Sequence, residues 1–149
     1  MDQDAFRNTY RDVNTRSCAY EKSILTQQGG CSQNERFCIA EREGVRCLSD
    51  LGQTRCLEFL KLLRDHARFA LRTDQDKSVL PHGKAIRIQV GGLRGLEVVL
   101  SGNVPKEIQD IYNLIDRALQ RFGSLDQMPF STIMQQVAAY RGRTRSRRR

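Results

Sequence analysis

The sequence predicts an α+β fold: a small, mostly helical domain with a cysteine-rich metal-binding loop, one β-hairpin and a disordered basic C-terminal tail. Three observations lead to this prediction. Apolar residues recur every three or four positions through most of the chain, one segment switches to strict alternation, and all five cysteines lie between Cys18 and Cys56. A chain of 149 residues can bury roughly two-thirds of its unfolded surface, so it does not need a metal merely to fold.

Residues 1–72 are predicted to form a helical, cysteine-rich, metal-binding region. Apolar spacing predicts a helix over 3–28 that ends at a pair of glycines, with Cys18 in helical conformation. A charged stretch between an asparagine and a glycine predicts a short capped helix over 35–43, which carries the third cysteine. A third helix is expected over 55–72, where an apolar stripe begins at the last cysteine.

Residues 73–140 are expected to complete the same domain with a β-hairpin and two helices packed on it. Turn-forming residues predict a loop over 73–84. Apolar and polar residues then alternate on both sides of the sequence GGLRG, which predicts a hairpin over 86–100. Apolar stripes predict the two helices over 105–122 and 129–143.

A hairpin of two strands is marginal in water, and its backbone leaves open edges. We therefore expect a homodimer or a protein partner to bind at the hairpin over 86–100. The glycines of GGLRG are not expected to bind phosphate, because they lack the dinucleotide spacing and the G-K-[ST] ending of a P-loop.

The cysteine spacing, C-x12-C-x6-C-x8-C-x8-C, predicts a metal site. An odd number of cysteines in a reducing compartment favours ligation over disulfides. The C-x2-C pairs typical of zinc ribbons and fingers are absent, and no histidine lies among the cysteines. Iron-sulfur clusters accept wider ligand spacing, so a [4Fe-4S] cluster is the preferred cofactor. Zinc and unligated core cysteines are the alternatives.

Four of the five cysteines would be needed for such a cluster. Glycines next to Cys31 and Cys47 would let the segment around Cys38 fold back, so these three are expected to be ligands. Cys18 lies off the apolar stripe of its predicted helix and is chosen as the fourth. Cys56 begins an apolar stripe, as an inert core cysteine would, and is kept in reserve.

The basic charge of the chain is concentrated at its C-terminus. Removing the six arginines of the last nine residues from the formal net charge of +8 leaves +2. Arginines interleaved with Gly, Thr and Ser cannot form a core, and they suit nucleic-acid phosphates or an acidic protein surface. The expected contact residues of this tail, 141–149, are Arg141, Arg143, Arg145, Arg147, Arg148 and Arg149.

The remaining features argue against catalysis and against a membrane. No catalytic Ser-His-Asp or Cys-His-Asp grouping can be argued, so we do not expect an enzyme. Apolar runs are far too short to cross a bilayer, and the acidic N-terminus has no apolar run behind it, which predicts a cytoplasmic protein.

The expected function is a small iron-sulfur protein, regulatory or redox-sensing, that associates with nucleic acid or a ribonucleoprotein. One alternative is an iron-sulfur accessory or electron-transfer subunit docked on an enzyme complex. Another is a zinc-stabilised interaction module.

Overall fold

The structure, a computed structural model, describes residues 3–71 and 81–141. Within these ranges six α-helices, one short 3-10 helix and one antiparallel pair of strands confirm a mostly helical α+β fold. The elements in chain order are α1 (Gln3–Val13), α2 (Glu21–Leu25), β1 (Asn34–Ile39), β2 (Arg42–Cys47), α3 (Asp50–Leu71), α4 (His82–Ser101), α5 (Ile111–Phe122), η1 (Leu125–Gln127) and α6 (Phe130–Ala139).

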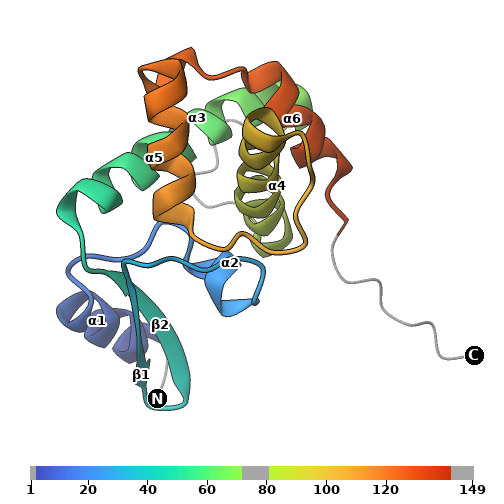
Figure 1. Cartoon of the computed structure of the whole chain (residues 1–149). Coiled ribbons are helices and arrows are strands. Elements are labelled where there is room, and N and C mark those ends of the chain that lie inside the picture. Colours follow the sequence, from blue (N-terminus) through green and yellow to red (C-terminus); the bar gives the residue numbers. More distant parts are fainter. Residues whose placement is uncertain (1–2, 72–80, 142–149) are drawn as a thin grey trace, which may run out of the picture.

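The chain has two visible parts (Figure 1). The long helix α3 and the later helices α4, α5 and α6 pack together and contain most of the buried apolar residues. The hairpin β1–β2 extends away from them with α1 beside it, and α2 lies between the two parts. No helix within the described ranges is long and apolar enough to span a bilayer.

The one hairpin of the described chain lies over 34–47, where the sequence predicted a short helix. Its strands pair Asn34 with Cys47 and Ile39 with Arg42, which leaves a two-residue turn. Ala40 in that turn has a φ of 55°, in the left-handed region. Turns of this kind normally carry Asn-Gly or Gly, so the sequence offered no turn signal and the prediction was wrong.

A cross-strand aromatic contact stabilises this hairpin. The ring of Phe37 lies over its partner Gly44, where an added Cβ would meet the ring at 2.4 Å. Tyr10 of α1 packs on the other part of the ring, with centroids 5.8 Å apart, and the guanidinium of Arg46 lies 4.6 Å from its centre. Glycine is therefore needed at position 44 to admit the ring.

The hairpin predicted over 86–100 is wrong, because this segment forms the buried helix α4. Its glycines are contact points and not turn residues: a Cβ on Gly91 would lie 2.6 Å from Val137 Cα, and one on Gly95 would lie 2.7 Å from the Ile133 carbonyl oxygen. A Cβ on Gly92 would meet Leu63 of α3 at 2.4 Å. There are no strand edges here, so the reason for expecting a dimer or partner at this segment disappears.

The other helix boundaries correct the predictions less severely. The helix predicted over 3–28 is interrupted, and Cys18 lies in an extended segment between α1 and α2 and not in a helix. Helix α3 begins earlier than predicted, whereas α5 begins later, with Asp110 as its N-cap. The end of α5 at Gly123 is confirmed, with a φ of 86°. The predicted tail beyond Arg141 lies outside the described residues.

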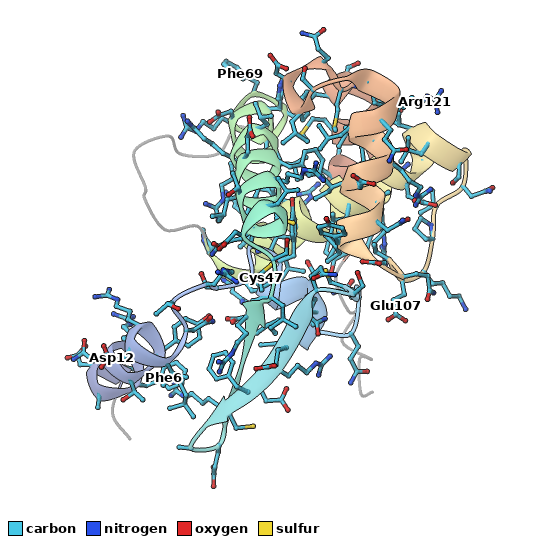
Figure 2. The ribbon with its side chains drawn as sticks, turned by 60° about the vertical axis from the view of Figure 1, so that its left-hand side comes forward. Phe6, Asp12, Cys47, Phe69, Glu107 and Arg121 are labelled. Atoms are coloured by element: carbon cyan, nitrogen blue, oxygen red, sulfur yellow. The ribbon has the colours of Figure 1, made fainter. Side chains whose placement is uncertain are left out.

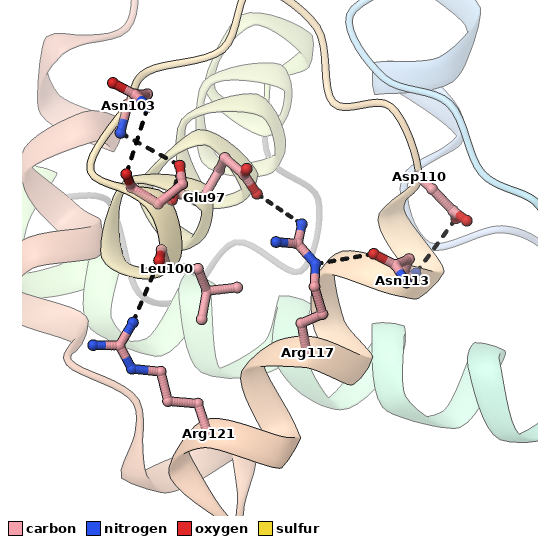
Figure 3. Close-up of polar contacts among 8 residues, drawn as sticks. Glu97, Leu100, Asn103, Asp110, Asn113, Arg117 and Arg121 are labelled. Carbon is pink, nitrogen blue, oxygen red and sulfur yellow. Dashed lines mark hydrogen bonds and ion pairs between the residues drawn. The ribbon is translucent and has the colours of Figure 1, made fainter.

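Two arginines attach α5 to α4 (Figure 3). Arg117 donates to Glu97 Oε2 at 3.0 Å and to Asn113 Oδ1 at 2.9 Å. Arg121 donates to the carbonyl oxygens of the last turn of α4, that of Val99 at 3.1 Å. These contacts are exposed, so they contribute orientation more than stability, while the buried apolar face of α5 supplies the stability.

We predict that Gly95→Ala lowers the free energy of unfolding by about 1–3 kcal/mol, because the new methyl group would overlap the backbone of α6. Urea unfolding of the metal-free protein followed by circular dichroism measures this change. Gly83→Ala in the same helix is the matched control, since, apart from its chain neighbours and the nearby backbone of α4, no described atom lies within 4 Å of its added Cβ. This control should be neutral or stabilising by up to about 1 kcal/mol through helix propensity. Equal effects of the two substitutions would contradict close packing at position 95.

Candidate metal centre

Four of the five cysteines line one pocket where the hairpin meets the helices. Figure 2 shows Cys47 at this junction. The pocket is partly open to solvent, and the space within it that a water molecule can reach is about 20 Å³. Its other walls come from the residues after Cys18, the start of β1, the first turns of α3 and the start of α5. The thiol-bearing lining residues are Cys18, Cys31, Cys47 and Cys56.

Cys18 reaches the pocket because its segment runs antiparallel to β2. The Cys18 N–H donates to the Val45 carbonyl at 3.1 Å, and the Cys47 N–H donates to the Arg16 carbonyl at 2.8 Å. This short pairing forms a third strand-like edge, with a bridge between Ser17 and Arg46. Cys18 and the last residue of β2 are thereby held side by side.

Cys31 is placed by backbone bonds between its loop and the start of α5. Gly30 donates to the Ile108 carbonyl and accepts from the Ile111 N–H, both at 2.8 Å. Asp110, the N-cap of α5, accepts from the Ser32 N–H at 3.0 Å. Burial opposes ionisation of Asp110, but the hydrogen bonds from Ser32 and from the first turn of α5 outweigh it and lower the pKa of this carboxyl.

Cys56 enters the pocket from the second turn of α3. It lies one turn after Gly52, which also lines the pocket and shares the same helix face. A Cβ on Gly52 would approach the ring of Tyr112 to 3.0 Å, so the absence of a side chain there lets α3 and α5 approach each other around the thiols.

Cys38 is separate from these four thiols. It lies exposed on β1, paired with Glu43 on the solvent side of the hairpin, and the pocket as described does not include it. The structure thus brings together Cys18, Cys31, Cys47 and the reserve residue Cys56. It leaves out Cys38, one of the three cysteines that the sequence most strongly predicted to be ligands.

The four thiols lie close enough to act on one another electrostatically. Burial is the largest cause that raises the pKa of Cys18, to about 12, and the charges of Cys31 and Cys47 raise it further. Burial likewise raises the pKa of Cys31, with a contribution from Cys47. It also raises the pKa of Cys56, and the charges of the other three thiols add to the effect. Every pair among the four is therefore coupled.

Backbone amides point at two of the sulfurs. The Gln33 N–H donates to Cys31 Sγ at 3.4 Å, and the Tyr112 amide also lowers the pKa of this thiol. The Tyr20 amide does the same for Cys18. Such N–H donors favour the thiolate over the thiol, which is the form that binds metal.

Two of the lining residues carry a buried polar atom without a hydrogen bond inside the described ranges. One atom is the hydroxyl oxygen of Tyr20, and the other is Nε of Arg46, which has only the Glu35 carboxylate at 3.5 Å. Of the three arginines between Cys31 and Cys47, Arg46 is the one that lines the pocket. Arg36 instead donates to the Ile24 carbonyl, and Arg42 lies over the ring of Phe6.

The arrangement differs from a closed site for one ion. Within residues 3–71 and 81–141, no three His, Cys, Asp or Glu side chains converge closely enough to hold a single metal ion. Zinc would require all four sulfurs about 2.3 Å from one point. In a [4Fe-4S] cluster each thiolate binds a different iron, so the ligating sulfurs stand further apart than around one zinc ion, and thiols are the donor type that such a cluster takes.

The chain matches no protein-family model, no curated protein and no solved structure.

In the folded, metal-free protein we predict that iodoacetamide alkylates Cys38 well before Cys18 and Cys56. Cys38 is exposed, whereas burial keeps the other two thiols protonated and so unreactive. Timed quenching followed by peptide mass spectrometry measures the five rates. In urea the rates should become similar, because unfolding removes the difference in burial. Labelling of Cys56 as fast as Cys38 in the folded protein would show that the pocket is not formed.

Proposed function

We propose that this chain binds an iron-sulfur cluster, of the [4Fe-4S] type, through Cys18, Cys31, Cys47 and Cys56. The observation that carries the proposal is the convergence of these four thiols on one pocket, with every pair coupled. The four proposed ligands are far apart in the sequence. They come from four different segments, so the site exists only in the folded chain and cannot be a chance result of neighbouring sequence positions.

The residues around the thiols suit this chemistry. Binding requires the thiols to lose their protons, which their buried and mutually repelling positions oppose in the metal-free protein. The amides of Tyr20, Gln33 and Tyr112 offset part of this cost for Cys18 and Cys31, and the charge of Arg55 does so for Cys56, because these groups favour negative charge on the sulfurs. When bound, the cluster supplies one-electron redox chemistry and a four-point cross-link.

The proposed role is regulatory or redox-sensing. The pocket lies where the hairpin and α2 meet the helical part, and its ligands come from both. Cluster loss would leave buried thiols and one unpaired hydroxyl between the two parts. The hairpin would then lose the cross-link that runs through the cluster from Cys47 to Cys56 of α3 and to Cys31. A change in cluster state is thereby converted into a change in how firmly the hairpin is held.

Association with nucleic acid or a ribonucleoprotein is proposed for the C-terminal tail. Of its six arginines, Arg141 is described, and its guanidinium donates to the Ala138 carbonyl at 3.4 Å. The support for this role is the charge distribution, since the chain without these six charges has a formal net charge of only +2. A role as an electron-transfer subunit of an enzyme complex is the alternative if the tail binds no nucleic acid.

We predict that protein purified without oxygen is brown, with broad visible absorption, and contains iron and acid-labile sulfide in equal amounts. Cys56→Ser should lose this absorption, because a hydroxyl replaces one of the four pocket thiols. Cys38→Ser is the matched control and should keep full absorption and iron content. Colourless wild-type protein carrying one zinc per chain would replace the cluster with the zinc alternative. Loss of iron from Cys38→Ser with retention in Cys56→Ser would show that the pocket is not the site.

For the tail, we predict that deletion of residues 141–149 abolishes binding to duplex DNA while the visible absorption stays unchanged. Each phosphate contact contributes about −0.9 to the slope of log affinity against log salt, so six arginines allow a slope of at most about −5. Fluorescence anisotropy across a salt series measures both variants. Absence of binding by the full chain at low salt would end this proposal and favour the accessory-subunit alternative.

A further inference from the structure

The hydroxyl of Tyr20 is the most unusual polar group of the pocket. The Tyr20 side chain is fully buried, with 0% of its surface exposed, and its hydroxyl finds no hydrogen-bond partner within residues 3–71 and 81–141. Buried polar groups in native proteins nearly always have a partner, and a missing one costs stability. A buried phenol with no partner therefore points to a group that the structure does not contain.

The surroundings of Tyr20 identify the direction in which that group lies. Tyr20 lines the four-cysteine pocket. Burial is the main cause that raises its pKa, and the charges of Cys56 and Cys18 raise it further whereas that of Arg64 lowers it, so these two thiols are among its near ionisable neighbours. A buried donor without an acceptor beside a pocket of four thiols calls for a ligand that presents acceptor atoms.

Two of the other three tyrosines have protein partners for their hydroxyls. The Tyr10 hydroxyl donates to Glu21 Oε2 at 2.6 Å, and the Tyr140 hydroxyl donates to Gln28 Oε1 at 3.1 Å. Both of these phenols are satisfied by protein groups, although both are less buried than Tyr20. The most deeply buried phenol thus lacks the protein partner that these two more exposed phenols have.

We propose that the Tyr20 hydroxyl donates a hydrogen bond to a sulfur atom of the bound cluster, on the side of Cys18 and Cys56, and thereby raises its reduction potential. This inference rests on the proposed function. The sulfur atoms of a cluster carry more negative charge after one-electron reduction, so a donor held against them stabilises the reduced form more than the oxidised form. Tyr20 acts as a positioning and tuning residue and takes no part in electron transfer itself.

Through the same hydrogen bond, the Tyr20 hydroxyl favours the loaded protein over the metal-free protein. In the metal-free protein the hydroxyl is buried without a partner, which destabilises the fold. In the loaded protein the hydroxyl is satisfied. Removal of the hydroxyl should therefore have opposite effects on the two states, which a phenol with an ordinary packing role would not produce.

The test compares Tyr20→Phe with the control Tyr140→Phe in the full-length chain purified without oxygen. Iron and sulfide content establish loading, a dye-mediated redox titration gives the midpoint potential, and urea unfolding gives the stability of each metal-free variant. For Tyr20→Phe we expect full loading, a lower midpoint potential and metal-free stability equal to or above that of the wild type. For Tyr140→Phe we expect an unchanged potential and lower stability, because removal of the Tyr140 hydroxyl takes away the donor to Gln28 Oε1.

The possible results separate this inference from the proposed function. A loaded Tyr20→Phe protein with the wild-type potential overturns the role of Tyr20 and leaves the cluster proposal intact. Lower metal-free stability of Tyr20→Phe would show an ordinary packing hydroxyl and also overturns it. A colourless wild-type protein that takes up neither iron nor sulfide overturns both. If Tyr20→Phe cannot be loaded, resonance Raman spectra of the wild type in H2O and D2O decide the matter, since an O–H donor to sulfur shifts the iron-sulfur stretching bands on deuteration and its absence does not.

Discussion

The close contact between α4 and its neighbours is the constraint on which the rest of the structure depends. Glycines cost a helix about 1 kcal/mol each relative to alanine, and α4 contains three of them in five positions. Their benefit is that they let neighbouring helices approach α4 closely. Gly91 and Gly95 admit the backbone of α6, and Gly92 admits the side chain of Leu63 from α3. Because α4 can be approached this closely, it forms the centre of the helical part, and α3, α5 and α6 take their positions from it.

Those positions determine where the cysteines can meet. Helix α3 brings Cys56 to the edge of the core, and the start of α5 holds the Cys31 loop through backbone bonds to Gly30 and an N-cap bond to Ser32. The N-terminal segment then joins through its pairing with β2. A carboxylate on α2 strengthens this connection, since Glu21 accepts from the Val45 N–H at 2.8 Å and from the Tyr10 hydroxyl. The pocket is therefore a product of tertiary packing in which each wall is held by bonds independent of the thiols.

The pocket combines features that are costly alone and consistent together. Four partly buried thiols repel one another when ionised, and the buried Tyr20 hydroxyl has no acceptor within the described residues. A thiolate-ligated cluster would neutralise the first cost and satisfy the second. This reasoning also separates Cys38 from the others. Cys38 is a solvent-exposed strand residue, and it is not among the residues that line the pocket.

The sequence by itself determined the α+β class, the existence of α3, α5 and α6, and the confinement of all thiol chemistry to residues 18–56, because apolar periodicity and residue identity are local properties. It could not decide between a hairpin and a helix for the segment containing GGLRG. Glycine is equally suited to a turn and to a close helix contact, and only the presence of α6 selects the second. The charged residues of β1 and β2 likewise predicted a helix, and only the packing of Phe37 on Gly44 selects the hairpin. The presence of Cys56 and not Cys38 in the pocket lining was also decided by tertiary structure, because a strand places Cys38 in solvent and the packing of α5 on α3 brings Cys56 to the pocket. The spacing of the cysteines in the sequence predicts neither orientation.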